Sequence, residues 1–233
     1  MKNCTVFCSL LFTVTATISH ADSLPGARPV IAAANYNSLQ AAFDAIPKEG
    51  GIVRLPAGNF EITEPLKLQR GDVRIEGAGS ATNIINTNTA GKSALIVQHA
   101  DGAKVKKDQR LCRVNLSNFR ITGNEKSGHG IEAIRIEEIF IQGVSVSYNG
   151  ADGIRLDNCY EDPRVSNCLL TYNKAVGLKL LGCHDIVVSS NQFEENKDAL
   201  HCIDSFNLCM TGNCVDDHLD RGVLIENTYG SVL

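Results

Sequence analysis

Residues 153–183 read GIRLDNCYEDPRVSNCLLTYNKAVGLKLLGC, which is one repeat of the chain and the start of the next. Gly153 with an apolar neighbour opens the first repeat, and Gly177 with an apolar neighbour opens the second. A fixed period of this length is typical of proteins in which each repeat stacks on its neighbours. The small-apolar pair recurs at steps of 23, 24, 22 and 23 residues: Gly130-Ile131, Gly153-Ile154, Gly177-Leu178, Ala199-Leu200 and Gly222-Val223.

Each repeat predicts two β-strands. A second inward-type residue follows two positions after the apolar one, and this alternation is that of a strand with one buried face. A run of apolar or β-branched residues precedes the pair and predicts another strand. We find no helical periodicity between residues 113 and 233. The preceding runs are Ile139-Phe140-Ile141, Val165, Ile186-Val187-Val188 and Leu208-Cys209-Met210.

Leucine-rich repeats share this period, and Ile154-x-Leu156-x-x-Cys159 is similar to their strand motif. Such a repeat needs a helix or a compact convex segment after its strand, whereas this chain supplies β-branched runs there. We therefore expect a stacked parallel β-helix rather than a horseshoe. Asparagines that tolerate the backbone of tight turns keep the same register, and we expect them to hydrogen-bond between coils: Asn124, Asn149, Asn173 and Asn196.

The open end of a solenoid needs a cap, and the N-terminal end supplies one. Asn37 can cap a short helix, with Gln40 as a loose capping box and Pro47 ending it. The apolar stripe of this helix suits it to cover the first coil, and its members are Leu39, Ala42, Phe43 and Ile46. Strand-turn units at residues 51–58 and 73–79 follow.

The run from Ser38 to Gly79, SLQAAFDAIPKEGGIVRLPAGNFEITEPLKLQRGDVRIEGAG, resembles the N-terminal segment of the pectate-lyase-like β-helix superfamily. The shared features are a capping helix, a Gly-Gly strand, a Pro-Ala-Gly turn before an aromatic residue and a strand ending Glu-Gly-x-Gly. With the later coils, the resemblance covers about residues 36–233. It implies an all-β, right-handed parallel β-helix with a short N-terminal capping helix. The superfamily includes pectate lyases, polygalacturonases, alginate and mannuronan epimerases and phage tailspikes.

The organisation expected from sequence and resemblance is a signal peptide over residues 1–21, a linker over 22–35 and a single β-helix domain over 36–233. Within that domain, residues 36–79 hold the cap and first strands, and 113–233 hold regular coils of about 23 residues. Lys2, an apolar stretch and small residues before Ala21 predict export, with cleavage near Ala21 and a secreted or periplasmic product. The stretch is too short and too Thr-rich for a membrane span.

The amino-acid composition argues against some classes of binding partner. The 22 basic and 26 acidic residues give a net charge of −4, and no basic run is present, so nucleic acid is a poor candidate. The absence of Trp argues against sugar binding on indole platforms. The expected partner is a polysaccharide. Seven of the nine cysteines follow the export signal, and we expect them to act as small buried hydrophobes.

One outward residue of each Gly-apolar strand should fall in line with the next, giving a ladder on one flank of the stack. Two cations in this ladder, Arg155 and Lys179, would lie about 5 Å apart and repel by about 3 kcal/mol at an effective dielectric constant of about 20. A uronate carboxylate would relieve that repulsion. The alternative is a solvated face on which the long side chains splay apart. The ladder is Glu132, Arg155, Lys179, His201 and Leu224, with Asp157 facing the same way as Arg155.

If the ladder is functional, it suits lyase or epimerase chemistry on an acidic polysaccharide. Both reactions remove a proton beside a carboxylate, so they need that charge neutralised and a base within reach. Arg155 and Lys179 would neutralise the carboxylate, and His201, kept neutral by the neighbouring lysine, would be the base. Asp157 would orient Arg155 or bind a cation. The other reading is a non-catalytic polysaccharide-binding or cell-surface structural β-helix.

Further residues are candidates for contact with sugar. Glu132 lies in the ladder, and Tyr148 and Tyr172 occupy matching turns, where they would stack on each other or offer a small platform. No clear calcium-binding carboxylate cluster is found, so no cofactor is expected, with calcium left as the alternative. Gly128-His129-Gly130 resembles a polygalacturonase motif, but the paired aspartates and the Arg-x-Lys motif of those enzymes are missing.

The repeat pattern also predicts an uncapped C-terminal end. Aligned by repeat, Val232 falls one residue into the first strand of another coil. The open edge would then meet a partner or a second copy by self-association, or further C-terminal coils are missing.

Overall fold

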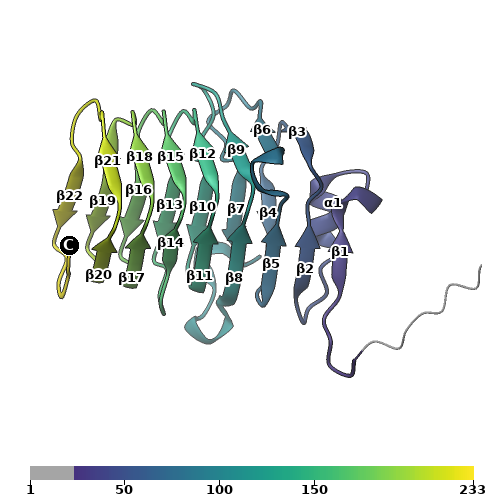
Figure 1. Ribbon diagram of the computed structural model, residues 1–233. Helices are drawn as coiled ribbons and strands as arrows, with labels where there is room; N and C mark the ends of the chain where they lie inside the picture. Colours follow the sequence, from purple (N-terminus) through teal and green to yellow (C-terminus); the bar gives the residue numbers. More distant parts are fainter. Residues whose placement is uncertain (1–23) are drawn as a thin grey trace, which may run out of the picture.

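The computed structural model describes residues 24–233, so the predicted signal peptide lies outside the described residues. The described chain winds through three parallel sheets in the repeating order A, B, C, and each coil stacks on the one before it (Figure 1). Each coil therefore has three strands, one more than the repeat pattern predicted. The missed strand, in sheet B, is only three residues long in the regular coils, too short to show an alternation of its own.

Sheet A contains β1 (Val30–Ala32), β2 (Gly51–Arg54), β5 (Val73–Glu76), β8 (Leu111–Ser117), β11 (Ile136–Gln142), β14 (Arg164–Ser166), β17 (His184–Ser189) and β20 (Phe206–Thr211). Sheet B contains β3 (Gly58–Ile62), β6 (Thr82–Asn86), β9 (Arg120–Thr122), β12 (Ser145–Ser147), β15 (Leu169–Thr171), β18 (Gln192–Glu194) and β21 (Cys214–Asp216). Sheet C contains β4 (Leu66–Leu68), β7 (Leu95–Gln98), β10 (Ile131–Ile134), β13 (Ile154–Asp157), β16 (Val176–Leu181), β19 (Asp198–Ile203) and β22 (Val223–Glu226).

The core is a set of inward columns that run along the stack. Ile131 pairs with Ile154, which pairs with Leu178, which pairs with Leu200, and all four side chains are fully buried. Burying one such side chain stabilises the fold by about 1.5–3 kcal/mol. The apolar residue of the small-apolar pair is therefore the inward anchor of sheet C, as the repeat predicts.

The glycine of the pair is required by the next coil. A Cβ atom on Gly153 would lie 2.7 Å from the carbonyl oxygen of Gly177 and 2.8 Å from the side-chain nitrogen of Asn173. At Gly222, the same repeat position in β22's coil, a Cβ would meet only Val215 at 3.6 Å. Close approach of successive coils therefore explains the glycine, rather than a left-handed backbone.

The predicted asparagine ladder forms over three coils. Asn149 Nδ2 donates to Asn173 Oδ1 at 2.9 Å, and Asn173 Nδ2 donates to Asn196 Oδ1 at 2.8 Å. Asn173 and Asn196 also donate to backbone carbonyls of the preceding coil. Asn124 does not join, because its Nδ2 donates to the carbonyls of Asn86 and Asn88 in a wider turn.

The N-terminal helix α1 (Leu39–Asp44) lies at the first coil, at the opposite end of the stack from the C-terminus (Figure 1). The predicted cap Asn37 is wrong by one residue, since Ser38 Oγ accepts the hydrogen bond from Ala41 N at 3.1 Å. Gln40 does not close a capping box but binds the backbone of Lys67. The predicted apolar stripe is buried. Short 3₁₀ turns complete the described helices: η1 (Ala33–Asn35), η2 (Gly79–Ala81), η3 (Gly102–Lys104) and η4 (Lys107–Gln109).

The cysteines follow the expected pattern only in part. Four are buried, but Cys209 and Cys214 are exposed and Cys112 is half-buried. Cys209 pairs with Val187 at an outward position of sheet A, which the expectation of burial overlooked. All seven described cysteines are free thiols: Cys112, Cys159, Cys168, Cys183, Cys202, Cys209 and Cys214.

Candidate functional site

The predicted ladder lies on the outer face of sheet C. Glu132 pairs with Arg155, Arg155 with Lys179, Lys179 with His201, and His201 with Leu224. Neighbouring strands lie about 4.8 Å apart, so residues separated by 22–24 positions stand side by side. The structure thus brings Arg155, Lys179 and His201 together; their catalytic roles remain predictions.

Arg155 is held by Asp157, as expected from their shared face. Arg155 Nη2 donates to Asp157 Oδ2 at 3.0 Å, and Asp157 Oδ1 accepts from Asn158 Nδ2 at 2.7 Å. Arg155 Nε is buried and has no hydrogen-bond partner among the described residues. Both oxygens of Asp157 are occupied, so this carboxylate is placed to orient the guanidinium.

Glu132 is the first residue of the ladder and lies next to the preceding coil. Its Oε2 accepts a hydrogen bond from Ser93 Oγ at 2.9 Å, across the boundary between β7 and β10. The carboxylate is half-buried and fixed, beside the cationic pair. A bound anion would therefore be confined to the segment from Arg155 to His201.

A second column of ionisable residues borders the ladder, and sequence reasoning missed it. One residue stands immediately before each small-apolar pair, and in four of five coils this residue is ionisable. This column could have been found in the sequence, because its members directly precede the small-apolar pair of each repeat. The column is His129, Asp152, Val176, Asp198 and Arg221.

Asp152 is only 3% exposed, but its carboxylate oxygens have polar contacts within the protein. Its Oδ1 accepts from Val176 N at 3.1 Å, and its Oδ2 lies 3.3 Å from His129 Nδ1. The backbone N–H of Asp152 also donates to His129 Nδ1 at 3.1 Å. Burial by itself would raise the pKa of Asp152, but the close contact with His129, the hydrogen bond from Val176 N and the charges of His129 and Lys179 lower that pKa overall. The buried carboxylate is therefore kept ionised near Lys179.

Asp198 supports the candidate base. Its Oδ1 accepts from Arg221 N at 2.7 Å, and its Oδ2 lies 3.3 Å from His201 Nε2. Asp198 is 2% exposed and His201 is 9% exposed, so the pair is largely screened from water. His201 Nε2 makes no hydrogen bond to Asp198 or to another group among residues 24–233, so Asp198 acts on the ring through its charge, and the other ring nitrogen is left to exchange a proton.

The surroundings keep His201 neutral. Burial lowers the pKa of His201, the charges of Lys179 and Arg221 lower it further, and Asp198 opposes them. The predicted direction is confirmed, but burial contributes more than the lysine. A neutral imidazole beside two cations can accept a proton at neutral pH.

Tyr148 and Tyr172 lie at the corner between sheets B and C. Their rings are 4.9 Å apart with an interplanar angle of 7°, so of the two predicted arrangements the mutual stack forms. Their mutual stack occupies one face of each ring, and the exposed fractions are 52% and 39%. Contact with a sugar is then limited to the remaining faces and edges.

Two further features of residues 24–233 bear on the site. No group of three or more His, Cys, Asp or Glu side chains is arranged to hold a metal ion in this part of the chain. None of the helices described here is long and apolar enough to cross a membrane.

The coil geometry agrees with a comparison against protein families. The model described as "right handed beta helix region" matches residues 101–233, which is more than half of the chain. The chain belongs to the right-handed β-helix family. A search of curated proteins gives no match.

Solved structures with the same fold come from viruses and from bacterial enzymes. The ORF18 protein of Geobacillus virus E2 aligns with a TM-score of 0.66 at 18% identity, covering 86% of this chain and 48% of that one. The mannuronan C-5 epimerase A-module of Azotobacter vinelandii aligns with a TM-score of 0.62 at 16% identity, covering 84% and 62%. The catalytic domain of an α-1,3-glucanase aligns with a TM-score of 0.55 at 14% identity, covering 91% and 42%.

At these identities the likeness shows the β-helix fold alone. The chain spans between 42% and 62% of the length of these three structures.

Proposed function

We propose that this protein binds an acidic polysaccharide along sheet C and removes the proton next to a uronate carboxylate, as a lyase or an epimerase. The observation that carries the proposal is the register of Arg155, Lys179 and His201, which puts two cations and a neutral imidazole on successive strands. The names of two structural relatives, a mannuronan epimerase and an α-1,3-glucanase, make a polysaccharide the natural ligand class.

The proposed chemistry begins with charge neutralisation. Arg155 and Lys179 bind the carboxylate of one sugar residue, which makes the hydrogen on the adjacent carbon more acidic. His201 accepts that proton on the nitrogen that does not face Asp198. Asp198 stabilises the imidazolium that forms, and Asp157 holds Arg155 in place.

The carbanion then has two fates. In a lyase its electron pair forms a carbon–carbon double bond and expels the glycosidic oxygen, which takes a proton from water. In an epimerase water delivers a proton to the opposite face of the same carbon, and no bond of the chain is broken. In both cases the His201 imidazolium then returns its proton to water. Export of the protein, proposed from the N-terminal sequence, would place it where such polymers are found.

The test uses purified protein with polygalacturonate and with alginate, in heavy water. A lyase gives an unsaturated product that absorbs in the ultraviolet, and an epimerase incorporates deuterium at the inverted carbon, which NMR detects. Lys179→Ala and His201→Ala should each abolish the product. Lys67→Ala is the matched control, because Lys67 lies in the same column of sheet C but is separated from Arg155 by Ile96 and Glu132.

Full turnover by Lys179→Ala or His201→Ala would contradict the mechanism. Binding of polymer without product in the wild-type protein would instead favour the non-catalytic polysaccharide-binding function.

A further inference from the structure

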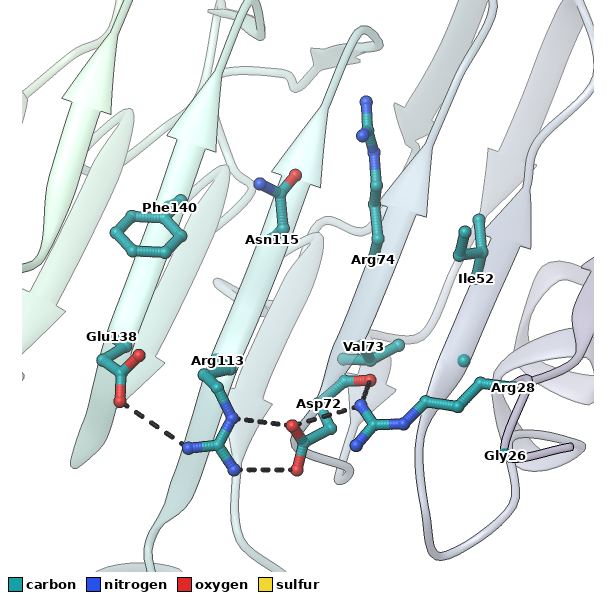
Figure 2. Close-up of a pocket in the computed structure, with 11 residues that line it drawn as sticks. Gly26, Arg28, Ile52, Asp72, Val73, Arg74, Arg113, Asn115, Glu138 and Phe140 are labelled. Atoms are coloured by element: carbon teal, nitrogen blue, oxygen red, sulfur yellow. Dashed lines mark hydrogen bonds and ion pairs between the residues drawn. The ribbon is translucent and has the colours of Figure 1, made fainter.

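A groove of about 670 Å³ lies on the outer face of sheet A, on a different sheet from the candidate site (Figure 2). The N-terminal segment at Gly26 and Arg28 forms one end, and Phe140 on β11 forms the other. The floor is the outer surface of β2, β5 and β8. Nothing in the proposed chemistry of sheet C uses these residues.

A row of outward side chains runs through the groove along the axis of the stack. Ile52 pairs with Arg74, Arg74 with Asn115, and Asn115 with Phe140, and the row continues to Arg164 beyond the groove. Neighbouring members are about 4.8 Å apart. An extended chain lying along this row would meet an arginine, an amide and an aromatic ring in succession.

The acids of the groove are already neutralised. Arg113 makes two bonds to Asp72, Nε to Oδ1 at 2.7 Å and Nη2 to Oδ2 at 3.0 Å, and Arg28 Nη1 lies 3.1 Å from the same carboxylate. Arg113 Nη1 also lies 3.7 Å from Glu138 Oε1 (Figure 2). The hydrogen bonds with Arg113 lower the pKa of Asp72 to about 2. Three arginines, counting Arg74, and two acids line the groove, and Glu76 just outside it balances Arg74, so the groove carries no excess of negative charge.

Three side chains in the groove still have groups that could contact a ligand. Asn115 Oδ1 is buried and has no hydrogen-bond partner in the described part of the chain. Arg74 pairs with Glu76 at 2.8 Å through Nη2, and its side chain is 44% exposed. Arg164 lies 5.6 Å from the ring centroid of Phe140 on the strand away from Asn115, so the other face of the ring is directed along the row.

We propose that this groove is a second, non-catalytic binding site for an anionic sugar polymer. Arg74 pairs with a sugar carboxylate, Asn115 Oδ1 accepts a sugar hydroxyl, and Phe140 packs against the apolar face of a sugar ring. The groove binds the polymer without cleaving it, since both of its acids, Asp72 and Glu138, are paired with Arg113. The choice of an acidic glycan rests on the proposed function, whereas the existence of the site rests on sheet A alone.

Calorimetric titration of the purified 1–233 chain with hexagalacturonate tests the inference, with neutral maltohexaose as the comparison ligand. We expect two binding events in the wild-type protein. Arg74→Ala should weaken one of them by about tenfold, the loss of one charged hydrogen bond. Asn115→Ala should weaken the same event. Arg54→Ala, which removes the same charge from exposed β2 outside the groove, should leave both events unchanged.

The outcomes separate this inference from the proposed function. A single event that Lys179→Ala removes, or an Arg74→Ala titration identical to the wild type, would overturn the second site. Equal affinity for maltohexaose would overturn its anionic character. If Lys179→Ala retains full turnover while Arg74→Ala still loses one binding event, the function proposed for sheet C fails and the second site stands.

Discussion

Arg155 and Lys179 are direct register partners on adjacent strands β13 and β16, and both project from the outer face of sheet C. Among residues 24–233, Asp157 is the one carboxylate within ion-pair distance of either of them. Lys179 makes no ion pair of its own among residues 24–233, although the buried acid Asp152 lies near enough to feel its charge. This unpaired ammonium beside the held guanidinium is the feature from which the proposed function follows.

The loss of activity at acidic pH should follow the protonation of His201. Its pKa is lowered by burial and then by Lys179 and Arg221, so the ring stays neutral, and active as a base, until the pH falls below 6.5. We expect activity to be lost as the pH drops further and the ring takes a proton. Arg221→Gln removes a neighbouring cation without changing the ladder, and it should raise the pKa of His201.

NMR titration of the His201 ring, alongside the pH dependence of turnover, checks this prediction. Both midpoints should move to higher pH in Arg221→Gln. Arg54→Gln on distant sheet A should move neither. An unchanged His201 titration in Arg221→Gln would show that the second column does not act on the base.

Asp72 should contribute to acid stability. Its pKa is lowered from 3.8 to about 2, chiefly by Arg113, so its contribution is complete above about pH 4 and is lost as the pH falls towards 2. Asp72→Asn should cost about 1 kcal/mol at neutral pH, because the pair is open to solvent. Asparagine tolerates the positive φ of 53° found there.

Urea unfolding followed by circular dichroism measures this effect. The difference between wild type and Asp72→Asn should shrink as the pH is lowered from 7 to about 2.5. Asp108→Asn, on an exposed turn and in no ion pair among residues 24–233, should show no such convergence. A constant difference at all pH values would mean that the Arg113 pair is not the source of the stability.

The glycine of the repeat gives a matched pair of variants. Gly153→Ala should destabilise the fold by about 2 kcal/mol, since its Cβ would press on the next coil's backbone at 2.7 Å. Gly222→Ala occupies the same repeat position with its nearest contact at 3.6 Å, so it should be tolerated. Equal losses in thermal unfolding would refute close coil approach as the reason for the glycine.

The asparagine ladder should be costly to interrupt. Asn173→Ala removes the side chain that donates to Val146 O and Asn196 Oδ1 and accepts from Asn149, and leaves buried groups unpaired. We expect a loss of about 3 kcal/mol in the free energy of unfolding. Asn37→Ala, at an exposed position whose side chain makes no hydrogen bond among residues 24–233, should cost less than about 0.5 kcal/mol. A similar small loss for Asn173→Ala would contradict the role of the ladder.

The strands of sheets A and C could be predicted from sequence because their buried residues repeat with the coil. Ile154 and Leu178 mark the inward column, and the residue after each, Arg155 or Lys179, then has to point outward. The strands of sheet B were missed because three residues such as Ser145–Ser147 carry only one apolar position.

The rest of the candidate site was missed for a different reason. Asp152 precedes β13 and Asp198 is the first residue of β19, at the edge of the alternation that says which way a side chain points, and Val176 interrupts their column. The groove on sheet A has no repeat signal at all. Asp72 comes just before β5, and Arg113 and Glu138 are the third residues of β8 and β11. Each takes a positive φ there, of 53°, 55° and 57°, and the three side chains meet.

The most direct test of the account is a crystal structure of the His201→Ala variant with an oligouronate bound. We expect a sugar carboxylate within hydrogen-bond distance of Arg155 or Lys179 on sheet C, with the hydrogen-bearing carbon facing the space left by the imidazole. An oligouronate that binds only elsewhere, with Arg155 and Lys179 free of it, would contradict it.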